Sequence, residues 1–301
     1  MAIGIDPTVD YAFKRLFGSP EHAAITVHFV NAVLDPSHPI VEIELLNPFL
    51  EKQSETDKLA ILDIRARDDQ GRWLNIEIQT TVPGYLPERL TYYVSSLYAN
   101  QLQEGENYAQ LRPAVCICVL DRVLFGQVAE PHLCFSLTAD KYGLSLTDHL
   151  QVHLLELPKY NGRDDRAAGP TSLDKWFFFF RNVSRLTQAE VVDQLQDAPF
   201  EEAAGVLEMI ARTPSERDLY EARLKQSRDE EARLQGAWQR GREEGREEGR
   251  EEGRLAGQIQ LLQQLLGDQE TALERLQQQP LKELQILVSS LQERLRNRDS
   301  N

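Results

Sequence analysis

Cysteines, long apolar runs and a targeting signal are scarce or missing in this chain, and each lack excludes a class of protein. Three cysteines in 301 residues, with no CxxC spacing, argue against a disulfide framework and a zinc site. No stretch approaches the roughly 18–20 apolar residues that a membrane span needs. The N-terminal residues lack the basic segment and apolar run of a secretory signal. We therefore expect no membrane association and a cytoplasmic location.

The three cysteines themselves are expected to be packing residues. Cys116 and Cys118 lie two positions apart in PAVCICVL, an apolar run typical of a buried strand, and Cys134 lies in another apolar run, HLCFSL. Because free cysteine behaves as a small hydrophobic residue, we predict that all three belong to the core.

The chain also has fewer basic than acidic residues. The chain has 33 Lys and Arg against 48 Asp and Glu, a net charge of −15. This balance argues against the broad basic surface of a protein that coats duplex nucleic acid. It does not exclude an enzyme that binds nucleic acid through a metal ion, because a bound cation locally inverts the negative electrostatic field of the protein. With 41% hydrophobic residues, the chain has ample material for a globular core.

The most informative pattern present is a strict alternation of polar and apolar residues on both sides of the turn signal at 68–71. The residues at 63, 65, 67, 73, 75, 77 and 79, all polar except Trp73, alternate with apolar ones, which predicts a β-hairpin. A three-residue loop ending at Gly71 places Arg67 opposite Trp73. Counting outward, Asp63 then lies opposite Glu77, with Gln79 one step along the same face.

Two acids opposite each other across a sheet are destabilising unless something compensates them. Their Cβ atoms would lie about 5 Å apart, close enough for both carboxylates to bind one hard divalent cation. Asp63 and Glu77 therefore suggest a metal site. The alternative is an ordinary hairpin whose polar face is solvated.

The remaining patterns predict an α/β protein with a mixed sheet, followed by an all-helical region. We expect helices over 8–17, 21–34 and 87–102, and strands over 40–49, 58–67, 72–80, 112–120, 132–139 and 151–158. From about residue 171 onward we expect only helices. The first of these, LDKWFFFFRNVSRL, is interpreted as a core or interface helix, and further helical segments are expected over 187–212 and 214–238.

A repeat of Gly-Arg-Glu-Glu follows, with glycines at 241, 245, 249, 253 and 257. A four-residue period keeps glycine near one face of a helix. The glycines either let two helices of an oligomer approach closely, as in a coiled coil, or form a solvated, semi-flexible spacer. The last block, 258–298, has helical spacings of Leu and Ile with a break at Gln279-Pro280.

Several segments together resemble the Rpn family of recombination-promoting nucleases and transposase-like proteins. These are DYAFKRLFG, LDIRARDDQGRWLNIEIQ, ERLTYYVSSLYANQL, LDKWFFFF, ARTPSERDLYEARLKQSRDEEARLQGA and the Gly-Arg-Glu-Glu repeat, spanning roughly residues 6–256. The resemblance implies a PD-(D/E)xK nuclease-like domain over 1–184. A helical extension over 185–238, the repeat as helix or linker over 239–257 and a small helical region over 258–301 would follow.

The resemblance also implies roles for individual residues. Asp63 and Glu77 would bind Mg²⁺ or Mn²⁺, with the backbone carbonyl of Ile78 as a third ligand. Gln79 takes the place of the lysine of the wider superfamily, as it does elsewhere in this family, and Leu62 replaces the proline of the motif. Glutamine cannot act as a general base, but it can orient a water or a phosphate by hydrogen bonds.

Positive charge at such a site would have to come from another residue. Lys58, Lys14 and Arg89 are the candidates, although Lys58 lies five positions before Asp63 and would point to the other face of an ideal strand. Asp10, which forms an i,i+4 pair with Lys14 on the first helix, could add another acid.

The implied activity is metal-dependent hydrolysis of DNA by an endonuclease linked to recombination or mobile elements. The alternative is a catalytically weak or inactive nuclease-like scaffold that oligomerises through its C-terminal helices. The net negative charge, the missing lysine and the long charged helices favour that alternative.

Overall fold

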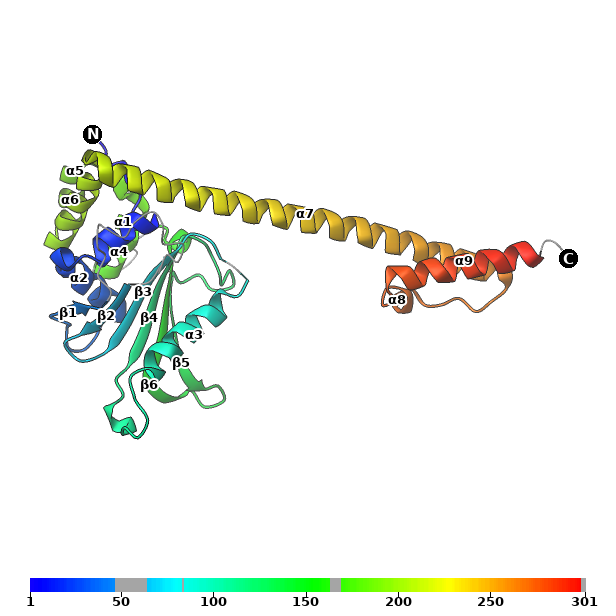
Figure 1. Cartoon of the computed structure of the whole chain (residues 1–301), viewed down its shortest axis with the longest axis horizontal. Helices are drawn as coiled ribbons and strands as arrows, with labels where there is room; N and C mark the ends of the chain where they lie inside the picture. Colours follow the sequence, from blue (N-terminus) through cyan, green and yellow to red (C-terminus); the bar gives the residue numbers. More distant parts are fainter. Residues whose placement is uncertain (47–63, 83, 163–168, 299–301) are drawn as a thin grey trace. The chain divides into compact units, whose positions relative to one another are not determined.

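The computed structural model describes residues 1–46, 64–82, 84–162 and 169–298. The chain forms two compact units, Met1–Arg228 and Asp229–Asn301. The first unit contains a β-sheet with helices on both faces (Figure 1). The second unit is helical in its described part.

The sheet is mixed, with strand order β1-β2-β3-β4-β6-β5. Its strands are β1 (Ile43–Leu45), β2 (Ile64–Asp68), β3 (Trp73–Gln79), β4 (Ala114–Leu120), β5 (His132–Ala139) and β6 (Leu144–Glu156). The first three strands pair in antiparallel fashion, β3, β4 and β6 are parallel, and β5 is antiparallel to β6. The predicted α/β class with an antiparallel opening hairpin is confirmed.

One face of the sheet packs against a helical layer. This layer comprises α1 (Asp10–Phe17), α2 (Ala23–Leu34), α4 (Ser172–Asn182), α5 (Gln188–Leu195) and α6 (Ala198–Arg212). Trp176 of α4 is 1% exposed, and its ring lies 4.6–5.5 Å from those of Phe17, Phe29 and Phe200. The LDKWFFFF run is therefore part of the main core, as its composition predicted.

The opposite face is covered by α3 (Leu86–Ala99), which connects the parallel strands β3 and β4 (Figure 1). Leu86, Leu90 and Val94 of this helix pack in a second apolar cluster. Cys116 and Cys118 of β4 belong to the same cluster and are buried, as predicted. Strand β3 is consequently covered on both faces.

The predicted helix over 187–212 is two helices. Gln196 has a φ of 61°, the left-handed conformation that commonly ends a helix, and it ends α5. Pro199 lies in the first turn of α6, where its missing N–H has no cost. The proline was the available signal for this break.

Strand β6 is longer than predicted, because it begins at Leu144 instead of residue 151. Its first residues are mostly exposed and pair with β5, the outer strand of the sheet. Register shifts interrupt this pairing on both sides of Leu137. The outer position of β5 also corrects the prediction for Cys134, which is exposed and not a core residue.

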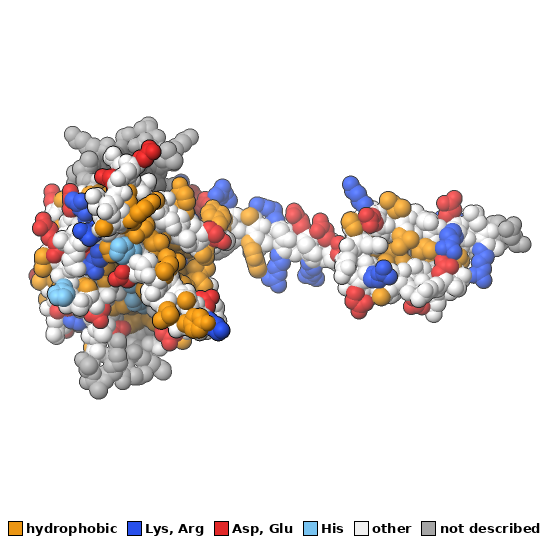
Figure 2. Space-filling model, turned by 90° about the horizontal axis from the view of Figure 1, so that it is seen from below, with side chains coloured by type: hydrophobic (Ala, Val, Ile, Leu, Met, Phe, Trp, Pro, Cys, Tyr) orange, Lys and Arg blue, Asp and Glu red, His pale blue; other side chains and the backbone are white. Residues whose placement is uncertain are grey.

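The long helix α7 (Pro214–Leu266) begins in the first unit and continues into the second. At its start, Glu216 accepts hydrogen bonds from the Tyr11 hydroxyl (2.9 Å) and Arg15 Nε (3.2 Å). The Gly-Arg-Glu-Glu repeat lies within α7, and all residues over 241–250 are exposed. Figure 2 shows side chains of both charges along the exposed part of this helix.

The second unit has a small core of its own. Leu255 and Ile259 of α7 pack with residues of α8 (Leu273–Leu276) and α9 (Leu281–Arg298). In the described part of the chain, no helix is both long enough and apolar enough to cross a membrane.

A histidine pair joins β5 and β6 and makes stability depend on pH. His132 Nε2 lies 2.9 Å from His153 Nδ1, and burial together with the charge of His132 lowers the pKa of His153 to about 4. The unfolded chain therefore takes up a proton near pH 6.5, whereas the folded chain does so only near pH 4.

We expect this pair to reduce the free energy of unfolding by about 3 kcal/mol as pH falls from 6.5 to 4, with no further loss from His153 below that range. Urea unfolding of wild type and His153→Gln at several pH values measures the effect. The variant should lose less stability over this window, and parallel profiles would contradict the assignment.

Candidate active site

The hairpin of β2 and β3 has the predicted register wherever it is described. Ile64 pairs with Ile76 and Arg67 pairs with Trp73, with Asp69-Gln70-Gly71 as the loop. Asp63 and Lys58 lie outside the described residues. Counting one position beyond the pair of Ile64 and Ile76 leads to Glu77 on β3.

Asp68 organises the turn that sets this register. Its Oδ1 accepts hydrogen bonds from the backbone N–H groups of Gln70 (3.0 Å) and Arg72 (2.9 Å), and its Oδ2 accepts one from Arg72 Nε (2.6 Å). Gly71 has a φ of 82°, which strains any residue with a Cβ. The alternation and the turn residues therefore specify one pairing.

The polar face of β3 is buried instead of solvated. Asn75, Glu77 and Gln79 are 3%, 0% and 7% exposed. The solvated-face alternative is therefore wrong for this strand, because α3 covers the face that the alternation makes polar. On β2, Arg65 and Arg67 of the same face are exposed.

Glu77 is held by side chains from three elements. Gln79 Nε2 donates to Glu77 Oε2 at 3.0 Å, and Arg89 Nη2 of α3 lies 3.5 Å from the same oxygen. The thiol of Cys116 on β4 lies 3.8 Å from Glu77 Oε1. The sequence marked Cys116 only as a core residue, and nothing in its spacing linked it to Glu77.

The other predicted site residues have different surroundings. Lys14 Nζ lies 3.3 Å from Asp10 Oδ1, which confirms the predicted i,i+4 pair on α1. The side chain of Ile78 is buried in the main core, on the other face of β3 from Glu77. Among the three proposed cations, Arg89 has a described contact with Glu77. Its Nε is buried with no hydrogen-bond partner among the described residues.

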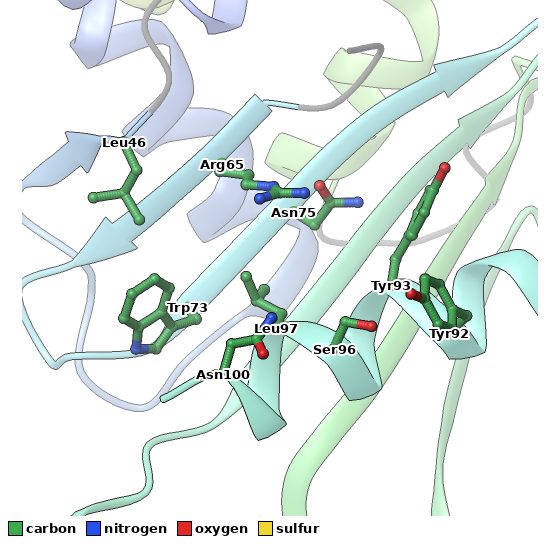
Figure 3. Close-up of a pocket in the computed structure, with 9 residues that line it drawn as sticks. All are labelled: Leu46, Arg65, Trp73, Asn75, Tyr92, Tyr93, Ser96, Leu97 and Asn100. Atoms are coloured by element: carbon green, nitrogen blue, oxygen red, sulfur yellow. The ribbon is translucent and has the colours of Figure 1, made fainter. Parts of the chain in front are cut away.

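A pocket of about 450 Å³ lies near Glu77, between the hairpin and α3 (Figure 3). It is lined by Leu46, Arg65, Trp73, Asn75, Tyr92, Tyr93, Ser96, Leu97 and Asn100. Arg65, Trp73 and Asn75 belong to the alternation of the hairpin, whereas Leu46 and the lining residues of α3 do not. The available signal in the sequence was the Tyr92-Tyr93 pair on an amphipathic helix. In the structure, Tyr92 is 68% exposed.

Residues 7–237 match the family described as PD-(D/E)XK nuclease family transposase. This match covers more than half of the 301 residues. The chain belongs to this family. No match was found among curated proteins or solved structures.

Membership of the PD-(D/E)XK nuclease family indicates the general chemistry of the chain. Proteins of this kind generally use divalent metals, and a nuclease-like function follows for this chain. Within residues 1–46, 64–82, 84–162 and 169–298, however, no three His, Cys, Asp or Glu side chains form a group that could hold a metal. Glu77 therefore does not belong to such a group of three among the described residues.

The hydrogen bonds of Asp68 allow a test of what stabilises the turn of the hairpin. We expect Asp68→Ala to lower the free energy of unfolding by about 1–3 kcal/mol, because the backbone N–H groups of Gln70 and Arg72 and the Arg72 guanidinium lose their acceptor. Asp69→Ala is the matched control, since Asp69 is exposed and its one described side-chain bond, to Val41 N, is 3.4 Å long. Urea unfolding of both variants measures the difference. Equal losses would show that the Asp68 network does not fix the turn.

Proposed function

We propose that this chain hydrolyses DNA phosphodiester bonds as a metal-dependent endonuclease, in recombination or the movement of mobile elements. The observation that carries the proposal is Glu77, a fully buried carboxylate bound by Gln79 and Arg89 within a chain of the PD-(D/E)XK nuclease family. A buried acid of this kind needs compensation, and a metal ion with a cationic side chain supplies it.

The donor set fits a hard cation such as Mg²⁺ or Mn²⁺. Glu77 offers a carboxylate, and we assign the Asp63 carboxylate and the Ile78 carbonyl as the other protein ligands, because oxygen donors suit these ions. A bound divalent ion supplies Lewis acidity, which lowers the pKa of a water and offsets negative charge on the phosphate.

Gln79 and Arg89 have separate roles in this proposal. Gln79 holds the Glu77 carboxylate through its amide N–H and orients it toward the cation. Arg89 provides the positive charge that a glutamine lacks. The Arg89 side chain is 23% exposed, so part of its guanidinium can approach a phosphate oxygen and hydrogen-bond it. Lys14, paired with Asp10, and Lys58 are secondary candidates for that charge.

The decisive test is cleavage of DNA with Mg²⁺ or Mn²⁺ by purified wild type and variants. We expect Asp63→Ala and Glu77→Gln to lose at least about 100-fold in rate, and Arg89→Ala to lose about 10- to 100-fold, because each removes stabilisation of charge in the transition state. Glu88→Gln, an exposed acid beside Arg89, is the matched control and should cut normally.

Calorimetric titration with Mn²⁺ gives a readout that does not depend on turnover. Wild type should bind the ion, and Glu77→Gln should bind it more weakly, with circular dichroism showing that both are folded. Equal cleavage by wild type and Asp63→Ala would overturn the proposed active site. Equal Mn²⁺ affinity of wild type and Glu77→Gln would overturn the ligand assignment.

We also propose that the chain self-associates through its C-terminal helices, which is the alternative function if the site does not cut. The observation that favours it is the stripe of five glycines on α7. Apart from its chain neighbours and the nearby backbone of α7, a Cβ at any of these glycines would meet no described atom within 4 Å, so the stripe offers room for a second helix. The small-residue rule for close helix approach is best established in membranes, and here it would act in water.

Replacing Gly245, Gly249 and Gly253 by alanine separates a contact surface from a spacer. Helicity should rise, because alanine favours a helix by up to about 1 kcal/mol per site relative to glycine. If the stripe lets helices approach closely, the added methyl groups should also lower the mass measured by light scattering. A mass that stays unchanged while helicity rises would leave the stripe as a spacer.

A further inference from the structure

The pocket between the hairpin and α3 has the form of a binding site for a flat ligand. Strands β2 and β3 provide Arg65, Trp73 and Asn75, and α3 provides the facing wall (Figure 3). Trp73 lies toward one end, and Tyr92 and Tyr93 lie toward the other. The volume of about 450 Å³ falls within the usual range for small-ligand sites.

The chemistry of the lining selects an anionic ligand with an aromatic part. Of the nine residues that line the pocket, one is an arginine and none is acidic, although the chain carries a net charge of −15. The guanidinium of Arg65 extends toward Asn75 in the pocket (Figure 3). Tyr92 exposes 68% of its surface, so most of its ring is accessible from solvent. Exposed aromatic rings beside an arginine are typical of surfaces that bind single-stranded nucleic acid.

The pocket lies near Glu77, because Asn75 and Tyr93, which line it, are close to Glu77 and Arg89. Asn75 and Glu77 are two residues apart on β3 and share its buried polar face, which separates them by about 7 Å. Arg89 lies 3.5 Å from Glu77 Oε2, and its guanidinium carbon lies 5.8 Å from the ring centre of Tyr93. A strand whose phosphate reaches Glu77 would therefore bring a nearby nucleotide to the pocket.

We propose that this pocket binds one unpaired nucleotide of the DNA strand next to the cleaved phosphate, with its base against Tyr92 and a phosphate near Arg65, in the pocket that Trp73 also lines. The proposal rests on the nuclease function above. It makes single-stranded or frayed DNA the preferred substrate, because the faces of bases inside a duplex are covered by their neighbours. An aromatic side chain can stack only on a base that has left the duplex.

The three tryptophans of the chain allow the pocket to be observed directly. Trp176 is 1% exposed in the core, and Trp238 is 65% exposed on α7. In the full-length Trp238→Phe protein, Trp73 is therefore the tryptophan that a ligand can reach. We expect a short single-stranded oligothymidylate, added without metal to prevent cleavage, to quench its fluorescence. A duplex containing the same strand should quench much less.

Tyr92 provides the matched affinity test. Tyr92→Ala should weaken binding of the oligonucleotide at least about fivefold, the loss expected for one stacking contact, and Tyr92→Phe should restore it. Tyr108→Ala is the control, because Tyr108 is 81% exposed and does not line the pocket. Trp73→Phe should remove the quenching signal while fluorescence anisotropy still reports binding.

The outcomes separate this proposal from the nuclease function. Cleavage that depends on Glu77, with binding and quenching unaffected by Tyr92→Ala, would overturn the pocket and leave the nuclease in place. Quenching that depends on Tyr92, without any metal-dependent cleavage, would support the pocket as a single-strand site and overturn the nuclease. Equal quenching by duplex and single strand, or no binding at all, would overturn the pocket proposal.

Discussion

The burial of the Glu77 carboxylate on β3 constrains the rest of the first unit. The apolar face of β3 packs in the main core, and α3 covers the other face. Polar side chains on that second face cannot be hydrated freely, so they must satisfy one another. Gln79 and Arg89 do this for Glu77, which ties the hairpin to α3. A site built between two packed elements is held more rigidly than one built on loops.

Much of this arrangement could be predicted from local sequence. Period-two alternation and a glycine-ended loop predicted the pairing of Arg67 with Trp73, because a slip by one residue would turn every side chain to the wrong face. Whether the polar face of β3 is buried could not be predicted from this pattern. The same alternation fits a solvated and a covered face, and the position of α3 decides between them. That Arg89 contacts Glu77 likewise depends on how α3 packs on the sheet.

Errors outside the site share that origin. Cys134 has an apolar neighbourhood in sequence, yet it is exposed because β5 is the outer strand of the sheet. The early start of β6 was not predicted, because its first half pairs with β5 and is mostly exposed. The pocket beside Glu77 was missed because its aromatic residues come from the hairpin and α3, which meet only in the folded chain.

The glycine repeat of α7 has a consequence for how the molecule opens. Residues 241–250 are all exposed, and a helix without tertiary packing depends on intrinsic propensity, which glycine lowers. The amide hydrogens of this segment should therefore exchange with solvent through local fraying, long before either core unfolds. A protease that needs an extended chain would then find accessible backbone in this segment, while both cores stay folded.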